Sequence, residues 1–285
     1  TRTSSFALFA LESFNFDLFD LDVGGRLESV NLKNTSLERG FFPGAFSSTI
    51  KREISTNNTV FAGFDFTERA PNAVELFANG PHHALEQFEI GDSNMDVETS
   101  YNFTVGYTYK DGLDTLKIET YYNYIDDFIA ADRDGTTTPV EGEDMNDVIF
   151  SQYNALFTGL EVSGQYAFAK INDFDIISSV MMDFLKGYRT SNDKALSRIP
   201  QTKMNFGIQA INEEWDANLA YYHYFDKEFI GPFQTRTGGH SRLDFDLTRD
   251  FSFSDLSGHL MFTASNLLDT VGRNHLESKK ANVQF

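Results

Sequence analysis

The stretch Tyr101-Asn102-Phe103-Thr104-Val105-Gly106-Tyr107-Thr108-Tyr109 decides the fold class. Its odd positions are aromatic or aliphatic, and its even positions are polar or glycine. A period of two places alternate side chains on opposite faces of an extended chain, so the stretch predicts a β-strand with one apolar and one polar face.

The same alternation recurs along the whole chain. Soluble β-sandwiches, the alternative for such a pattern, have strands of roughly 5 to 6 residues, and the alternating segments here are longer. The apolar positions of four further segments are Phe19, Leu21, Val23 and Leu27; Leu160, Val162, Tyr166 and Phe168; Met204, Phe206 and Ile208; and Leu243, Phe245 and Leu247.

Short polar turns alternate with long loops between these segments, which is typical of an antiparallel up-and-down barrel with turns on one rim and loops on the other. The expected fold is therefore an all-β transmembrane β-barrel. The expected turns are 55–58, 110–113, 170–173, 212–214 and 254–258, and the expected loops are 33–44, 69–96, 131–147, 188–201, 230–238 and 269–279.

The segments predict about thirteen strands, the last of which ends at Phe285. Bacterial outer-membrane barrels usually have an even number of strands, so residues 1–285 are expected to supply the C-terminal portion of a larger barrel. A complete small barrel is the alternative.

Composition fits a membrane barrel better than a helical membrane protein. Mean hydropathy is slightly negative, and no apolar run is long enough to cross a bilayer as a helix. The chain has 29 Phe and 12 Tyr but one Trp, and these rings fall within the alternating segments. Such rings suit a lipid-facing band bordered by aromatic girdles.

The charge balance excludes one class of partner. The formal net charge is −19, so phosphate backbones would be repelled and nucleic acid is not expected as a partner. The chain has no cysteine, so any metal site must use His, Asp, Glu or carbonyl oxygens.

The loop Arg69–Asp96 contains the strongest candidate site. It holds the pair His82 and His83, and neutral imidazole suits divalent first-row metals. Exposed loops are commonly polar, so two solvated histidines are an equally ready explanation. Four carboxylates surround the pair: Glu86, Glu89, Asp92 and Asp96.

The loop also carries a family resemblance. Arg69-Ala70-Pro71, then Glu75-Leu76-Phe77-Ala78-Asn79-Gly80-Pro81-His82, then Phe88-Glu89-Ile90-Gly91-Asp92, resembles a loop of TonB-dependent outer-membrane receptors, most of all the zinc-uptake branch. Further similar segments are Arg198-Ile199-Pro200, Ala264-Ser265-Asn266-Leu267-Leu268-Asp269, Arg273-Asn274-His275 and the C-terminal Phe285.

The resemblance implies an outer-membrane receptor of a Gram-negative bacterium that imports zinc or another metal complex by TonB-coupled transport. Its partners would be outer-membrane lipid, TonB and an N-terminal plug domain, and no plug is visible in this sequence. The zinc or metal complex would be the transported substrate, with no resident cofactor. The candidate capture ligands are His82, ranked first, His83, Glu89, Asp92 and His275.

Three alternatives remain open. A ferric-siderophore or cobalamin receptor would use the same scaffold, because loops set selectivity. A passive porin would need neither plug nor TonB. An outer-membrane phospholipase would need an activated Ser, and the nearest candidate, Gly239-His240-Ser241-Arg242, lacks the characteristic His-x-Ser-Asn arrangement. The expectation is that the chain is not an enzyme.

Two minor features are interpreted as structural. The acidic segment Ala131–Asp147 places Asp132 and Glu143 at the first and twelfth positions of an EF-hand loop, but position six is Thr137 where the sharp turn needs glycine. We therefore expect a solvated acidic loop that concentrates cations. His223 and His240 border strands, and a structural or girdle role is favoured over ligation.

Overall fold

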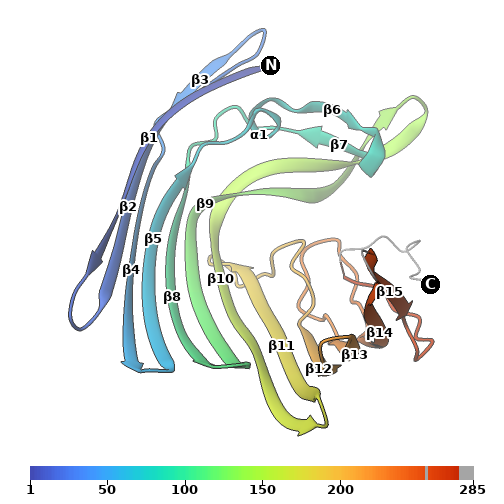
Figure 1. The fold of residues 1–285 in the computed structure, drawn as a ribbon. Helices are drawn as coiled ribbons and strands as arrows, with labels where there is room; N and C mark the ends of the chain where they lie inside the picture. The colour runs from blue at the N-terminus through green and yellow to red at the C-terminus, as the bar shows by residue number, and fades with distance from the viewer. Residues whose placement is uncertain (254–255, 276–285) are drawn as a thin grey trace.

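The computed structural model describes residues 1–253 and 256–275, which form one curved sheet of fifteen strands (Figure 1). Twelve strands follow one another in chain order and build the wall, each antiparallel to its neighbours. They are β1 (Arg2–Asn15), β2 (Asp20–Lys33), β4 (Gly44–Ser55), β5 (Asn58–Arg69), β8 (Glu98–Asp111), β9 (Asp114–Val140), β10 (Glu143–Ile171), β11 (Phe174–Arg189), β12 (Lys203–Ile211), β13 (Trp215–Tyr224), β14 (His240–Phe253) and β15 (Leu256–Ala264).

The all-β prediction is confirmed, and the turns expected at 55–58, 110–113, 170–173 and 212–214 join consecutive wall strands. Part of the turn expected at 254–258, and the strand expected to end at Phe285, lie outside the described residues. Among the described strands, β1 pairs only with β2 and β15 only with β14, so this sheet is an open wall.

No helix in the described part of the chain is long and apolar enough to cross a membrane.

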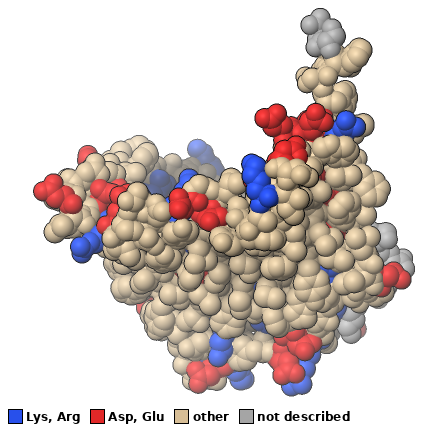
Figure 2. Space-filling view, turned by 60° about the horizontal axis from the view of Figure 1, so that its bottom comes forward, with Lys and Arg blue, Asp and Glu red and all other residues tan. Residues whose placement is uncertain are grey.

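The two faces of the wall differ as the alternation predicts. Phe103 and Val105 of β8 are 52% and 56% exposed on the outer face. Tyr101 and Tyr109 lie at opposite ends of this apolar stretch, about 27 Å apart along the strand. With strand tilt this length approaches the apolar band of about 25 Å in outer-membrane barrels. In Figure 2, Lys, Arg, Asp and Glu gather mainly along the margins of the face in view.

Aromatic rings on the inner face lie over glycines of the neighbouring strand. Phe61 of β5 is paired with Gly106 of β8, and Tyr121 of β9 is paired with Gly159 of β10. A Cβ built on either glycine would collide with the opposite ring. These glycines therefore supply the space in which the two rings pack.

The region expected as a structureless loop from Arg69 to Asp96 is ordered, which corrects that part of the sequence interpretation. It contains α1 (Ala73–Phe77), β6 (Asn79–His82), the 3₁₀ turn η1 (His83–Leu85) and β7 (Gln87–Ile90). Asn72 begins α1 with a capping box, in which its side chain accepts from the backbone of Glu75 and Glu75 accepts from the backbone of Asn72. A further short strand, β3 (Glu38–Phe41), pairs with β2 in the loop before β4.

The prediction of an acidic loop at Ala131–Asp147 is also wrong, because β9 and β10 continue through this segment as a paired hairpin. Glu143 pairs with Val140 across the turn, and Gly142 adopts a positive φ of 93° there. The Thr-rich sequence 136–138 favours a strand. We call residues 131–149 the extension hairpin; Figure 1 shows it bending away from the wall beside β6 and β7.

Candidate functional site

The candidate capture loop, residues 69–96, is fixed to the wall by a cluster of three charges. Arg69, at the end of β5, donates to Glu75 of α1 at 2.9 Å and contacts Glu98 of β8 at 3.3 Å. Glu98 also accepts from the backbone N–H of Ile129 at 2.8 Å. The arginine of the family-like motif therefore joins the helix to three strands of the wall, and its role in this structure is architectural.

A close backbone approach shapes the rest of the loop. The N–H of Gly91 donates to the carbonyl of Ala78 at 2.8 Å, and the N–H of Asp92 donates to the carbonyl of Glu75 at 2.9 Å. A Cβ on Gly91 would lie 2.8 Å from both Ala78 N and Glu75 O. The Gly-Asp step thus returns the chain across the end of α1, and glycine is required by the lack of space.

Apolar side chains beneath the loop join it to neighbouring segments. Leu76 of α1 and Met95 are each 2% exposed. They form one cluster with side chains of β2, β3 and β9, so three regions of the chain share a small core at this rim. The other buried members are Leu32, Phe41 and Ile129.

The β6–β7 hairpin presents the histidine pair. β7 also pairs in parallel with β10, where residues 87–90 run beside 146–149, so the hairpin is held against the extension hairpin. His82 ends β6, His83 begins η1, and both are exposed. The structure therefore places both imidazoles at the surface on an ordered support.

The two carboxylate candidates of this loop have local hydrogen bonds. Glu89, on β7, accepts from the side-chain amide of Gln87 at 2.9 Å. Asp92 is exposed and accepts from the N–H of Asn94 at 2.8 Å. Within residues 1–253 and 256–275, no three His, Asp or Glu side chains lie close enough together to hold a metal ion. A cation held by His82 would therefore take further ligands from elsewhere.

His275 lies in a different environment, at 8% exposure. Its Nδ1 is 2.9 Å from Thr237 Oγ1, its Nε2 is 3.3 Å from Gln234 Oε1, and its N–H donates to Gln201 at 3.0 Å. Burial, followed by the charges of Lys227 and Arg273, lowers its pKa, so the ring is neutral near pH 7. Both ring nitrogens already have partners, and His275 ties the last loop to its neighbours.

Asp132, the first position of the EF-hand-like spacing, is committed to a partly buried ion pair. Its Oδ2 contacts Arg189 at 2.5 Å and accepts from Tyr153 at 3.0 Å, while Oδ1 accepts from Ser197 at 2.8 Å. Arg189 also lies over the Tyr153 ring at 3.7 Å. These contacts join the extension hairpin to the loop after β11, and they leave Asp132 without a role in an EF-hand-like site.

His223 and His240 are packed on aromatic rings. His223 approaches Phe225 edge-on at 4.6 Å, and its Nδ1 is 2.9 Å from Ser241 Oγ. His240 stacks on Tyr224 at 4.4 Å. Both contacts are those of structural or girdle residues.

Sequence reasoning missed a row of carboxylates on the inner face. Glu119, Glu161 and Asp183 are direct cross-strand neighbours on β9, β10 and β11. Lys117 pairs with Glu119 at 2.7 Å, and Lys203 pairs with Asp183 at 3.0 Å. The sequence shows that each of the three lies on the polar face of its strand. It does not show the register that brings them side by side.

Glu161 and Asp183 also line a pocket of about 480 Å³, over which the last loop folds. Tyr121 and Lys203 contribute from the wall, and Gln201 and His275 from the loops. Because loop residues and inner-face residues share this pocket, the polar face is the covered side of the wall.

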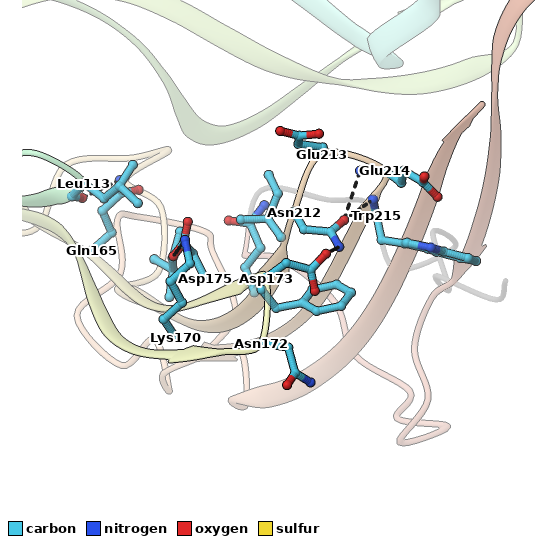
Figure 3. Close-up of a pocket in the computed structure, with 14 residues that line it drawn as sticks. Leu113, Gln165, Lys170, Asn172, Asp173, Asp175, Asn212, Glu213, Glu214 and Trp215 are labelled. Atoms are coloured by element: carbon cyan, nitrogen blue, oxygen red, sulfur yellow. Dashed lines mark hydrogen bonds and ion pairs between the residues drawn. The ribbon is translucent and has the colours of Figure 1, made fainter. Parts of the chain in front are cut away.

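A larger pocket of about 1180 Å³ lies at the opposite rim, among the short turns (Figure 3). Asn212 donates to Asp173 at 2.7 Å between two of these turns, and Lys170 contacts Asp175 at 3.2 Å. Glu213 and Glu214 are drawn at its edge. This pocket belongs to the turn rim, whereas the candidate capture loop belongs to the long-loop rim.

An apolar outer face, a polar inner face and loops that fold over one rim define the wall of a membrane β-barrel with a covered interior. A family model described as "TonB dependent receptor-like, beta-barrel" matches residues 1–267. The chain belongs to the TonB-dependent receptor β-barrel family.

Solved structures show the same fold. The chain is similar to a copper transporter, OprC, with a TM-score of 0.77 and 18% identity over 96% of this chain and 44% of that one. It is also similar to a ferric enterobactin receptor, PfeA, from Pseudomonas aeruginosa, with a TM-score of 0.68 and 16% identity over 94% and 40% of the two chains.

A siderophore receptor of the same organism, PirA, matches with a TM-score of 0.61 and 15% identity over 95% of this chain and 55% of that one. The chain thus spans about half or less of the length of these three proteins. At such identities the likeness establishes the fold, and the substrate has to be argued from the residues of this chain.

Proposed function

We propose that this chain forms part of an outer-membrane receptor that imports a scarce metal ion or metal complex by TonB-coupled transport, with zinc as the favoured substrate. The family match supports the transport class. The similar copper transporter and siderophore receptors support metal-linked cargo. A plug domain, TonB and outer-membrane lipid are the partners that this function requires.

The observation that carries the choice of a metal ion is the exposed pair His82 and His83 on the β6–β7 hairpin. An exposed neutral imidazole has a nitrogen lone pair available for a first-row metal. The hairpin is ordered by its pairing with β10, so little chain entropy would be lost on capture. Glu89 and Asp92, on the same loop, are the proposed accessory ligands, and both would have to move toward His82 to bind the same ion, because the described residues bring no three such side chains together.

His275 is the weakest member of the proposed ligand set, because binding a metal there would break a hydrogen bond at one of its ring nitrogens. We keep it as a conditional ligand that would act only if the last loop rearranges. Ferric-siderophore import is the second candidate function, and the similarity to the enterobactin and PirA receptors favours it over cobalamin or passive diffusion.

The test compares zinc binding by the full-length gene product with that of His82→Ala. Calorimetry is carried out at about pH 7.5, because a histidine binds a metal in its neutral form and protons compete with the metal at lower pH. We expect zinc affinity to fall about tenfold or more in His82→Ala, since a directly coordinating ligand is lost.

His259→Ala is the matched control, because His259 is an exposed histidine on β15, an edge strand that does not pair with β10, the strand that carries the histidine hairpin. It should bind zinc like the wild type. Equal zinc affinity in His82→Ala and wild type would remove His82 from the site. Ferric-siderophore binding by the same preparations would then decide for the second candidate.

A further inference from the structure

The extension hairpin contains a buried carboxylate whose charge has no visible counterpart. Asp147 of β10 is 6% exposed, and its Oδ1 has no hydrogen-bond partner within the described residues. None of the ion pairs found there includes Asp147. A buried, unpaired carboxylate is costly, and an unsatisfied oxygen of this kind points to a bound ion, a water or a proton.

The backbone aims Asp147 at a particular segment of β9. The register shifts at this point, since Asn146 pairs with Thr137 but Val148 pairs with Arg133. Three residues of β9, 134–136, therefore face the single residue Asp147. Such bulges redirect side chains and recur at functional positions.

The second carboxylate at this bulge is Asp134, and the two acidic side chains share one hydroxyl. Thr136 Oγ1 is 2.7 Å from Asp134 Oδ1 and 2.5 Å from Asp147 Oδ2. A hydroxyl has one proton, so it can donate to only one of these oxygens at a time. At the other contact, a lone pair of the hydroxyl oxygen faces a lone pair of the carboxylate oxygen at hydrogen-bond distance, and the two repel each other. A cation at this point would remove that repulsion.

The basic side chain beside the two carboxylates contacts other groups. The nearby Arg133 hydrogen-bonds to Asn146 and lies 5.6 Å from the Phe233 ring. Its guanidinium is therefore engaged on other groups.

We propose that Asp134, Thr136 and Asp147 form a binding site for a hard divalent cation, with Ca²⁺ as the best-matched ion. The donors are carboxylate and hydroxyl oxygens, which suit Ca²⁺ or Mg²⁺ better than the nitrogen-preferring transition metals. Ca²⁺ accepts irregular sets of 6–8 oxygens completed by carbonyls and water, whereas Mg²⁺ demands near-ideal octahedral geometry.

The site uses neither Asp132 nor Glu143, the two positions that gave the segment its EF-hand-like spacing. It is also separate from cargo capture, because it contains neither member of the histidine pair. Its position gives it a structural consequence: Asp147 is the β10 residue opposite Phe88 of β7. An ion bound there would join β9 to β10 where the capture hairpin is attached.

The experiment measures ⁴⁵Ca²⁺ binding to the full-length gene product in detergent at pH 7.5 by equilibrium dialysis. Two carboxylates per site predict a dissociation constant in the range of about 10⁻⁴ to 10⁻³ M, as in extracellular calcium modules. Asp147→Asn keeps the shape of the side chain and should remove about 0.5 to 0.9 bound Ca²⁺ per molecule at about 1 mM free Ca²⁺, the occupancy that these constants give. Asp134→Asn should do the same, and because Asp134 is exposed this variant tests the site even if Asp147→Asn fails to fold.

Asp144→Asn is the matched control, since Asp144 is an exposed carboxylate on the same strand, and it should retain the wild-type stoichiometry. A second readout is hydrogen exchange of residues 133–148 and 79–90. Ca²⁺ should slow this exchange in wild type and in Asp144→Asn, but not in Asp134→Asn or Asp147→Asn. Wild-type binding by both Asp134→Asn and Asp147→Asn would overturn the proposal. So would an equal loss in Asp144→Asn, which would indicate diffuse attraction to the acidic surface.

Discussion

Replacing Gly91 by alanine tests whether a single close approach holds the capture loop in place. The new Cβ would lie 2.8 Å from Ala78 N and from Glu75 O, both of them backbone atoms that cannot rotate away. The loop must then shift and weaken the bonds from Gly91 and Asp92 across α1. Overpacking of this kind typically costs about 1–3 kcal/mol.

The assay is hydrogen exchange measured by mass spectrometry on the full-length gene product. At about 1.4 kcal/mol per tenfold change, protection of the Gly91 and Asp92 amides should fall by about 5- to 150-fold. Protection of the interior wall strands, from β2 to β14, should not change, because each of them pairs with a neighbour on both sides.

Gly80→Ala provides the matched control in the same loop. A Cβ at Gly80 would meet no atom within 4 Å. Reduced freedom of the unfolded chain should leave that variant equally or slightly better protected. Equal exchange of residues 75–96 in Gly91→Ala and Gly80→Ala would refute the steric argument.

Three further predictions concern contacts elsewhere in the structure. Asp132→Asn should cost about 1–3 kcal/mol locally by leaving the partly buried Arg189 without its counter-charge, seen as faster exchange in residues 188–201 than in the control Asp144→Asn. Because the folded pKa of His275 is lowered, its stabilising contribution is complete above the unfolded value of about 6.5 and is lost as pH falls from there through the folded value. Exchange in residues 269–275, corrected for intrinsic rates, should therefore rise between pH 7.5 and pH 5, and His275→Gln should show little of this pH dependence. Gly106→Ala should lower the yield of folded, heat-modifiable barrel because it displaces the Phe61 ring, whereas Gly63→Ala, whose Cβ would meet only ordinary contacts of 3.5 Å or more, should fold normally.

The wall strands were predictable because each must present an apolar face outward and a polar face inward, as Tyr101–Tyr109 does. That constraint ends where the strands leave the apolar band. The extension hairpin has polar residues on both faces, so its period of two carries no hydropathy signal and the sequence reads as a loop. The helix and short strands of residues 73–90 were missed because their order comes from contacts with the wall, such as Arg69 with Glu98.

The candidate residues were recognisable by type, but their surroundings were not. His82 and His275 look alike in sequence, yet one is exposed and the other is buried against Gln201, a residue 74 positions away in the chain. Asp134 and Asp147 both reach Thr136 only because of a bulge that no local pattern reveals.

The rings that lie over glycines also settle an ambiguity that hydropathy leaves open. A slip of one residue between β5 and β8 would turn apolar side chains inward, but a slip of two would keep both faces correct. After such a slip Phe61 would face Thr104 or Thr108 in place of Gly106, and its ring would collide with a side chain. Phe61 with Gly106, and Tyr121 with Gly159, therefore fix the register of adjacent strands. The observed pairing leaves room for the rings, and a slip of two residues in either direction does not.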